Sequence, residues 1–149
     1  EYQGYSRLHD LPWVSAGISM QALVDTIEYL QVCGFPPVFI FMYDQTWQLL
    51  THLFDIMPDV LECEAVEMSL SVFAWALRPE GDNRQVGSNF WYPHRDQRYR
   101  DCHSVDGKLT AVTTWIPLVP VSVDNGCMYV VPSGQDPLLK ENDDPFHMK

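Results

Sequence analysis

The first third of the chain carries apolar residues at helical spacing. Between Ser19 and Cys33 they recur every three or four positions, which predicts an amphipathic helix. Ser19 is a suitable N-cap, and Gly34 is a suitable C-terminal stop. The prolines at 36–37 then end any helix, so the apolar run at 38–42 is predicted to be extended.

A second helical pattern begins at Asp44, which is a good N-cap, and runs to about Met57. Pro58 and Asp59 are expected to end this helix. Its apolar stripe consists of Trp47, Leu50, Leu53, Phe54 and Met57.

After residue 67 the hydrophobic period changes from helical spacing to alternation. β-branched and aromatic residues are frequent from here on, and this pattern predicts strands at 68–77, around His94, at 109–118 and at 127–131. Turn sequences separate them: a polar loop at 78–87, Asp106-Gly107, and Asp124-Asn125-Gly126.

Two helices followed by turn-separated strands exclude a βαβ architecture. The pattern predicts an α+β, mainly β fold, with an antiparallel sandwich or jelly roll behind a helical N-terminal lead-in. A jelly roll needs eight strands, and the sequence offers about four or five. We therefore expect one incomplete domain over 1–149, with the lead-in at 1–66, the first strands at 67–149, and the C-terminal half of the barrel missing.

Composition narrows the possible partners. The chain has 149 residues, 46% of them apolar, and a formal net charge of −11, which is a globular composition. The negative charge disfavours nucleic acid and anionic membranes, and no apolar run is long enough to cross a bilayer. Four widely spaced cysteines without a Cys-x-x-Cys pair predict free thiols and an intracellular, cytoplasmic location.

The candidate chemistry centres on His94-Arg95-Asp96. On an extended strand, residues two apart point to the same face, so the His94 imidazole and the Asp96 carboxylate can converge on one metal ion. With one more His they would form the facial triad of non-haem Fe(II) oxygenases. The alternative is a solvated loop with two unrelated polar side chains. Cys102 and His103 could also be ligands, but neighbours on a strand face opposite ways.

Three ordered elements resemble the phytanoyl-CoA dioxygenase family. They are His94-x-Asp96 with Arg95 between, the strand containing Trp115-Ile116-Pro117-Leu118, and the turn Asp124-Asn125-Gly126 leading into 127–132, and the resemblance covers roughly 69–132. The resemblance implies a double-stranded β-helix and an Fe(II)- and 2-oxoglutarate-dependent dioxygenase. It also implies a small-molecule substrate, organic or acyl, with dioxygen as co-substrate.

The same resemblance implies roles for individual residues. His94 and Asp96 would be the metal ligands and catalytic residues, and Trp115 would lie beside the 2-oxoglutarate, although it could equally be a core aromatic. Asn125 and Gly126 match a structural turn. A carboxylate at position 96 favours hydroxylation over halogenation.

Some family features are missing from this sequence. Gln135 follows Ser133-Gly134 where the family has a His. The family's second ligand His and its 2-oxoglutarate-binding Arg would lie beyond Lys149, so we expect the chain alone to be inactive. His147 sits in a polar tail and His103 lies too close to Asp96, so neither fits the distal ligand.

Several alternatives remain open at this point. Arg95 and Arg98 could meet an anionic substrate or cofactor, or could make surface salt bridges, which we favour for Arg98. The aromatic residues Phe90, Trp91, Tyr92 and Tyr99 could line an apolar pocket or belong to the core. The chain could also be a cupin-type metal protein without 2-oxoglutarate chemistry, a non-catalytic relative or a binding module.

Overall fold

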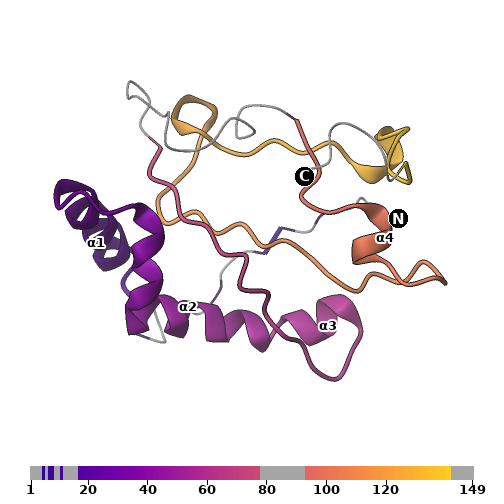
Figure 1. Ribbon diagram of the computed structural model, residues 1–149, viewed down its shortest axis with the longest axis horizontal. Coiled ribbons are helices and arrows are strands. Elements are labelled where there is room, and N and C mark those ends of the chain that lie inside the picture. The colour runs from indigo at the N-terminus through magenta and orange to yellow at the C-terminus, as the bar shows by residue number, and fades with distance from the viewer. Residues whose placement is uncertain (1–4, 6, 9–10, 12–16, 78–92, 142–149) are drawn as a thin grey trace. The chain divides into compact units, whose positions relative to one another are not determined.

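The computed structural model describes residues 5, 7–8, 11, 17–77 and 93–141 (Figure 1). The chain divides into two compact units. The helical unit comprises 10–81 and 116–126, and the α4 unit comprises 1–9, 82–115 and 127–149. The Phe90-Trp91-Tyr92 run, the 78–87 loop and His147 lie outside the described residues.

The first predicted helix is confirmed. α1 spans Met20–Val32, and the Ser19 hydroxyl caps it by accepting the Ala22 N–H at 3.2 Å. At its C-terminus Gly34 has φ +82°, and the Phe35 N–H bonds the Leu30 carbonyl at 2.8 Å, as in a Schellman motif. Only glycine adopts this backbone conformation without strain, so Gly34 ends the helix.

The extended conformation predicted at 38–42 is wrong. Pro37–Met42 is instead a 3-10 helix, η1, with Pro37 at its start, where a fixed φ and a missing N–H suit a first helical turn. The side chains of the next helix satisfy two of its carbonyls. Thr46 donates to the Ile40 carbonyl at 2.8 Å and Trp47 to the Phe41 carbonyl at 2.7 Å, so no neighbouring strand is needed.

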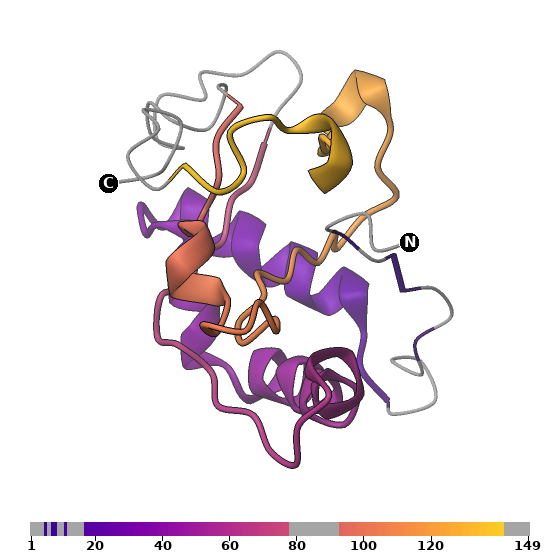
Figure 2. The same cartoon turned by 90° about the vertical axis from the view of Figure 1, so that its right-hand side faces the viewer.

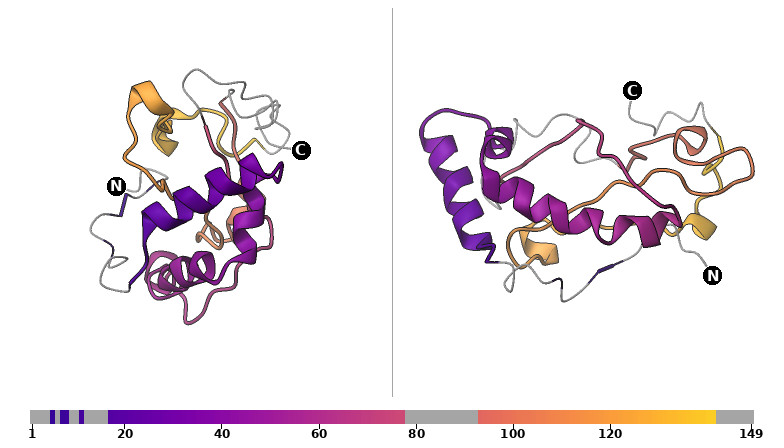
Figure 3. Two further views of the ribbon diagram at one scale, coloured as in Figure 1. Left: turned by 90° about the vertical axis from the view of Figure 1, so that its left-hand side faces the viewer. Right: turned by 90° about the horizontal axis from the view of Figure 1, so that it is seen from below.

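The second predicted helix forms in two pieces. α2 spans Asp44–Phe54 with Tyr43 rather than Asp44 as its N-cap, and α3 spans Met57–Leu61. Pro58 starts α3 instead of ending α2, as expected of a proline in a first turn. α2 and α3 follow one another nearly along one line (Figure 3). The buried residues of α2 are Thr46, Leu49 and Leu53. Leu53 belongs to the predicted stripe, whereas Trp47 and Phe54 of that stripe are exposed.

The core of the helical unit is formed by six buried aliphatic side chains: Ile18, Leu23, Ile27, Leu30, Ile40 and Leu49. Each buried Leu or Ile contributes about 1.5–3 kcal/mol relative to an exposed one. Ala74, Ala76, Ile116 and Leu118, from two predicted strands, also pack against this core. Both segments therefore pack on the core that the helices form.

The predicted jelly roll is wrong, and so is the mainly β class. The part of the chain that the structure describes contains helices and extended segments but no β-strand, and Figure 1 draws no arrow there. Along 71–76 burial does alternate, with Val72, Ala74 and Ala76 half-buried and each preceded by an exposed residue. The period of two thus predicted an extended backbone, but a strand also needs a partner at ladder distance.

The α4 unit contains a short helix and a tight turn (Figure 2). α4 spans Tyr99–Cys102 where a strand from His94 was expected to continue. The Asp106-Gly107 turn is confirmed: Gly107 has φ +82°, and an isolated antiparallel bridge joins His103 to Leu109. Two further short 3-10 helices are η3, Val123–Asn125, in the helical unit, and η4, Ser133–Gln135, in the α4 unit.

Candidate functional site

His94 and Asp96 lie in the segment that leads into α4, and the structure brings their side chains together. The His94 Nε2 atom lies 3.2 Å from the Asp96 Oδ1 atom. The two side chains are 27% and 47% exposed, so both donor atoms lie near solvent. In a non-helical segment residues two apart share a side, which explains why the pair converges.

The chemistry of this pair fits a divalent metal ion. Metal–ligand bonds to His nitrogen and carboxylate oxygen measure about 2.0–2.2 Å, so two neighbouring ligands of one ion lie roughly 3 Å apart. The observed 3.2 Å separation matches that spacing. Imidazole and carboxylate together suit Fe(II) and Mn(II). Within the described residues, no cluster of three or more His, Cys, Asp or Glu side chains gathers around one point.

Arg95, between the two candidate ligands, is bound to a residue far along the chain. Its Nε atom donates to Asp136 Oδ2 at 2.8 Å, and its Nη2 atom donates to Asp136 Oδ1. Both side chains are only 17% exposed. The sequence left Arg95 open between an anionic ligand and a surface salt bridge. The structure shows a half-buried, two-pronged ion pair, and no local spacing could have pointed to Asp136.

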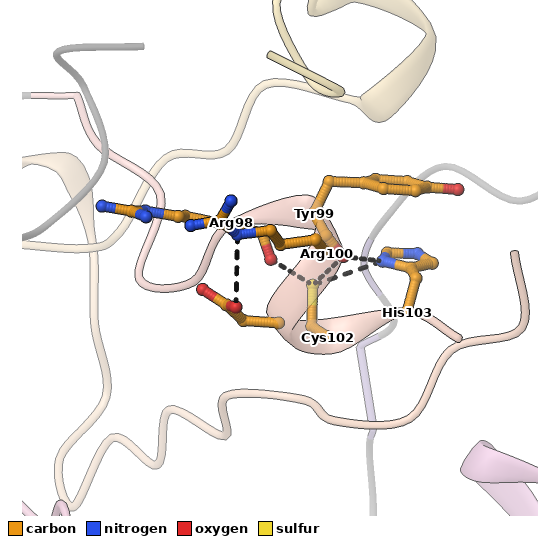
Figure 4. A network of polar contacts seen from close by, with 6 residues as sticks. Arg98, Tyr99, Arg100, Cys102 and His103 are labelled. Atoms are coloured by element: carbon orange, nitrogen blue, oxygen red, sulfur yellow. Dashed lines mark hydrogen bonds and ion pairs between the residues drawn. The ribbon is translucent and has the colours of Figure 1, made fainter. Parts of the chain in front are cut away.

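α4 holds a second polar cluster just after the candidate ligands (Figure 4). The Tyr99 ring stacks on the His103 ring with 3.9 Å between centroids, and His103 Nδ1 lies 3.1 Å from the Tyr99 carbonyl. The Cys102 thiol lies 3.3 Å from the Arg98 carbonyl and 3.3 Å from His103 Nδ1. His103 is therefore engaged within its own segment.

This cluster corrects the expectation that Cys102 and His103 face opposite ways. Cys102 belongs to a helix, not a strand, so the two side chains meet. Burial, helped by the negative charge of Asp101, raises the pKa of the Cys102 thiol. The Cys102 thiol donates to the Arg98 carbonyl, so it is engaged within its own segment.

The other residues singled out in the sequence have different surroundings. Trp115 lies in an extended segment with its side chain exposed. Asn125 is part of a turn: its side chain accepts the Ser122 N–H at 2.6 Å and donates to the Pro120 carbonyl at 2.8 Å. Gly126 has φ +89°, which confirms the structural role expected of this glycine.

Comparison with known families now adds to this geometry. The model of the phytanoyl-CoA dioxygenase (PhyH) family matches residues 80–147. The resemblance seen in the sequence is confirmed. The PhyH match starts and ends later than the 69–132 range expected from the motifs, and it contains His94, Asp96 and Trp115. The PhyH family is one of Fe(II)- and 2-oxoglutarate-dependent dioxygenases.

Other comparisons add nothing to this assignment. No curated protein and no solved structure matches the chain. Among the described residues, none of the helices has the length and apolar character needed to span a membrane.

Proposed function

We propose that this protein is an Fe(II)- and 2-oxoglutarate-dependent dioxygenase that hydroxylates a small organic or acyl substrate. The observation that supports it most directly is the 3.2 Å approach of His94 Nε2 to Asp96 Oδ1 inside the segment matched by the PhyH family. A His–Asp hydrogen bond has the same separation, so the position of the pair inside the matched segment is what favours a metal site.

Two of the chain's own residues would hold the metal. His94 would bind through Nε2, which requires a neutral imidazole, and Asp96 would bind through an ionised carboxylate. Bound Fe(II) with 2-oxoglutarate supplies the oxidation: one oxygen atom of O₂ enters the substrate C–H bond, and the other converts the 2-oxo acid to succinate with loss of CO₂. A third protein ligand, a His in this family, would complete the set.

The remaining residues would orient the reactants. Trp115 is proposed to flank the 2-oxoglutarate, for which its exposed indole offers a flat apolar face. Asp96 occupies a ligand position that would have to be vacant for a halide to bind, so hydroxylation is the favoured outcome. The proposal includes dioxygen and a small molecule as partners, and neither nucleic acid nor membrane.

An anaerobic titration tests the proposal. Fe(II) and then 2-oxoglutarate are added to the protein, and we expect the weak visible charge-transfer band of a chelated 2-oxo acid. His94→Ala should abolish the band, whereas His52→Ala should keep it. His52 is a matched control, because it also lies near an aspartate, Asp55, at 4.0 Å and is similarly exposed.

Two results would contradict the proposal. Fe(II) binding without any band on adding 2-oxoglutarate would indicate a metal-binding protein that lacks 2-oxoglutarate chemistry. Failure to bind Fe(II) would remove the metal site itself and leave a non-catalytic relative of the family.

A further inference from the structure

Arg95 is the residue that the proposed metal site does not use, although it stands between the two ligands. Its side chain is turned to Asp136, which lies 41 positions along the chain, through the Nε–Oδ2 bond of 2.8 Å and the Nη2–Oδ1 bond. A guanidinium fork on a carboxylate fixes orientation as well as distance, because both planes must align. The Arg95 side chain is therefore held through two of its guanidinium nitrogen atoms.

Asp136 is itself fixed, so it can serve as an anchor. It follows η4, and its N–H bonds the Ser133 carbonyl at 3.3 Å. Its Oδ1 atom also accepts the Leu138 N–H at 3.1 Å, which ties the carboxylate to the next turn. The carboxylate cannot rotate away from Arg95 without breaking a backbone contact as well.

A second contact joins the same two segments. The Lys140 ammonium lies 5.5 Å from the centre of the Tyr99 ring, within reach of a cation–π interaction. The segment at 133–141 thus touches the ligand-bearing segment at Arg95 and again at Tyr99. Two contacts in different places limit both sliding and rotation of the segment between them.

We propose that the Arg95–Asp136 ion pair positions His94 and Asp96 for metal binding, and this inference rests on the proposed function. His94 and Asp96 flank the fixed residue, and their side chains are more exposed than that of Arg95. Fixing the backbone between them holds the two donors at ligand spacing before the metal arrives. Arg95 is a positioning residue, not a catalytic one.

An electrostatic role and a positioning role for Arg95 predict opposite changes in metal affinity when Arg95 is removed. Removing a cation next to the ligands, while the Asp136 carboxylate stays, would tighten binding of a divalent cation if charge alone mattered. Loss of the anchor would weaken it. Partners that orient metal ligands typically account for about 10–100-fold in affinity.

Mn(II) titration of the 149-residue chain, followed by the electron paramagnetic resonance signal of the free ion, separates these signs. We expect Arg95→Met to weaken Mn(II) binding by about 10–100-fold. Arg95→Lys keeps the positive charge but not the two-pronged contact, so its Mn(II) affinity should lie between those of the wild type and Arg95→Met. Arg100→Met is the control, since Arg100 is exposed and its contact with Asp101 is long, at 3.7 Å.

Asp136→Asn provides a second variant in case Arg95→Met does not fold. The amide retains an acceptor for the Leu138 N–H but loses the ionic fork, so we again expect weaker Mn(II) binding. The double variant Arg95→Met/Asp136→Asn should be no weaker than the worse single variant, because the two residues act as one unit.

The outcomes distinguish the inference from the proposed function. If the wild-type chain binds Mn(II) and Arg95→Met binds it equally tightly or more tightly, the positioning role is overturned and the metal site still stands. The positioning role is also overturned if the loss of Mn(II) affinity in the double variant equals the sum of the losses, in free energy, of the two single variants. A wild-type chain that does not bind Mn(II) at all overturns both, and circular dichroism on each variant confirms that binding is compared between folded proteins.

Discussion

The described part of the chain presents two His–Asp pairs whose imidazoles are almost equally exposed, at 28% for His52 and 27% for His94. The atoms of the two pairs nevertheless approach differently. His52 Nδ1 lies 4.0 Å from Asp55 Oδ2, whereas His94 Nε2 lies 3.2 Å from Asp96 Oδ1. The carboxylates also differ, because Asp55 is 82% exposed and Asp96 47%.

The difference arises from the backbone that carries each pair. His52 stands in the last turn of α2 and Asp55 caps that helix, so the pair follows from ordinary helical spacing and faces water. His94 and Asp96 stand on a non-helical segment around Arg95, whose fork to Asp136 fixes the intervening residue. Residue types alone therefore do not distinguish the two pairs. The proposed metal site at His94 and Asp96 rests on the separation of its donors and on the held backbone.

The largest expected contrast is in metal affinity after removal of each carboxylate. Asp96→Ala should lower Mn(II) or Fe(II) affinity by more than about 100-fold, since losing a ligand exceeds the cost of losing a ligand's support. It should also abolish the charge-transfer band of bound 2-oxoglutarate. Asp55→Ala should change neither measurement. Unchanged metal affinity and an unchanged band in Asp96→Ala would show that the two pairs are equivalent and that the ligand assignment fails.

A second contrast concerns stability. Arg95→Met leaves the half-buried Asp136 carboxylate without its guanidinium partner, which should lower the free energy of unfolding by about 2 kcal/mol, as for other hydrogen bonds to charged groups. Urea denaturation measures this loss. Asp55→Ala is the comparison, because a fully hydrated carboxylate contributes little. Equal midpoints for wild type and Arg95→Met would mean that the fork does not anchor the segment.

The sequence predicted local features of the fold and missed the longer-range ones. Ser19 and Gly34 delimit α1 through hydrogen bonds to residues within one turn, which spacing can reveal. The strand predictions are wrong because the alternation at 71–76 specifies only which side chains turn inward. Whether the backbone finds another strand or a helical core depends on distant residues, and here Ala74 and Ala76 found the core.

In the candidate site, too, the local features could be predicted from the sequence and the long-range ones could not. His94 and Asp96 are separated by one residue, so their convergence could be expected from geometry alone. The fork between Arg95 and Asp136 joins positions 41 apart, and an aspartate after a Ser-Gly turn is equally typical of a plain surface loop. Cys102 and His103 were misjudged because a strand was assumed where α4 forms.

A smaller effect tests whether α4 is formed after His94 and Asp96. Burial raises the pKa of the Cys102 thiol, so its thiolate, the reactive form, appears at higher pH than an ordinary cysteine's. Iodoacetamide should therefore modify Cys102 more slowly than the exposed Cys63 near neutral pH, and the rates should converge as the pH rises. Peptide mass spectrometry resolves the two sites. Equal rates at neutral pH would mean that α4 does not shield its thiol.

The smallest expected effect is at His52. Its contact with Asp55 is long and one partner is solvated, so His52→Ala should change the free energy of unfolding by less than about 1 kcal/mol and leave metal affinity unchanged. Whatever the pair contributes should also fade in high salt, because solvent-exposed charges are screened. Urea midpoints at two salt concentrations measure both properties. A loss as large as that of Arg95→Met, insensitive to salt, would mean that exposure and distance do not separate a surface pair from an anchored one, and the contrast between the two regions would fail.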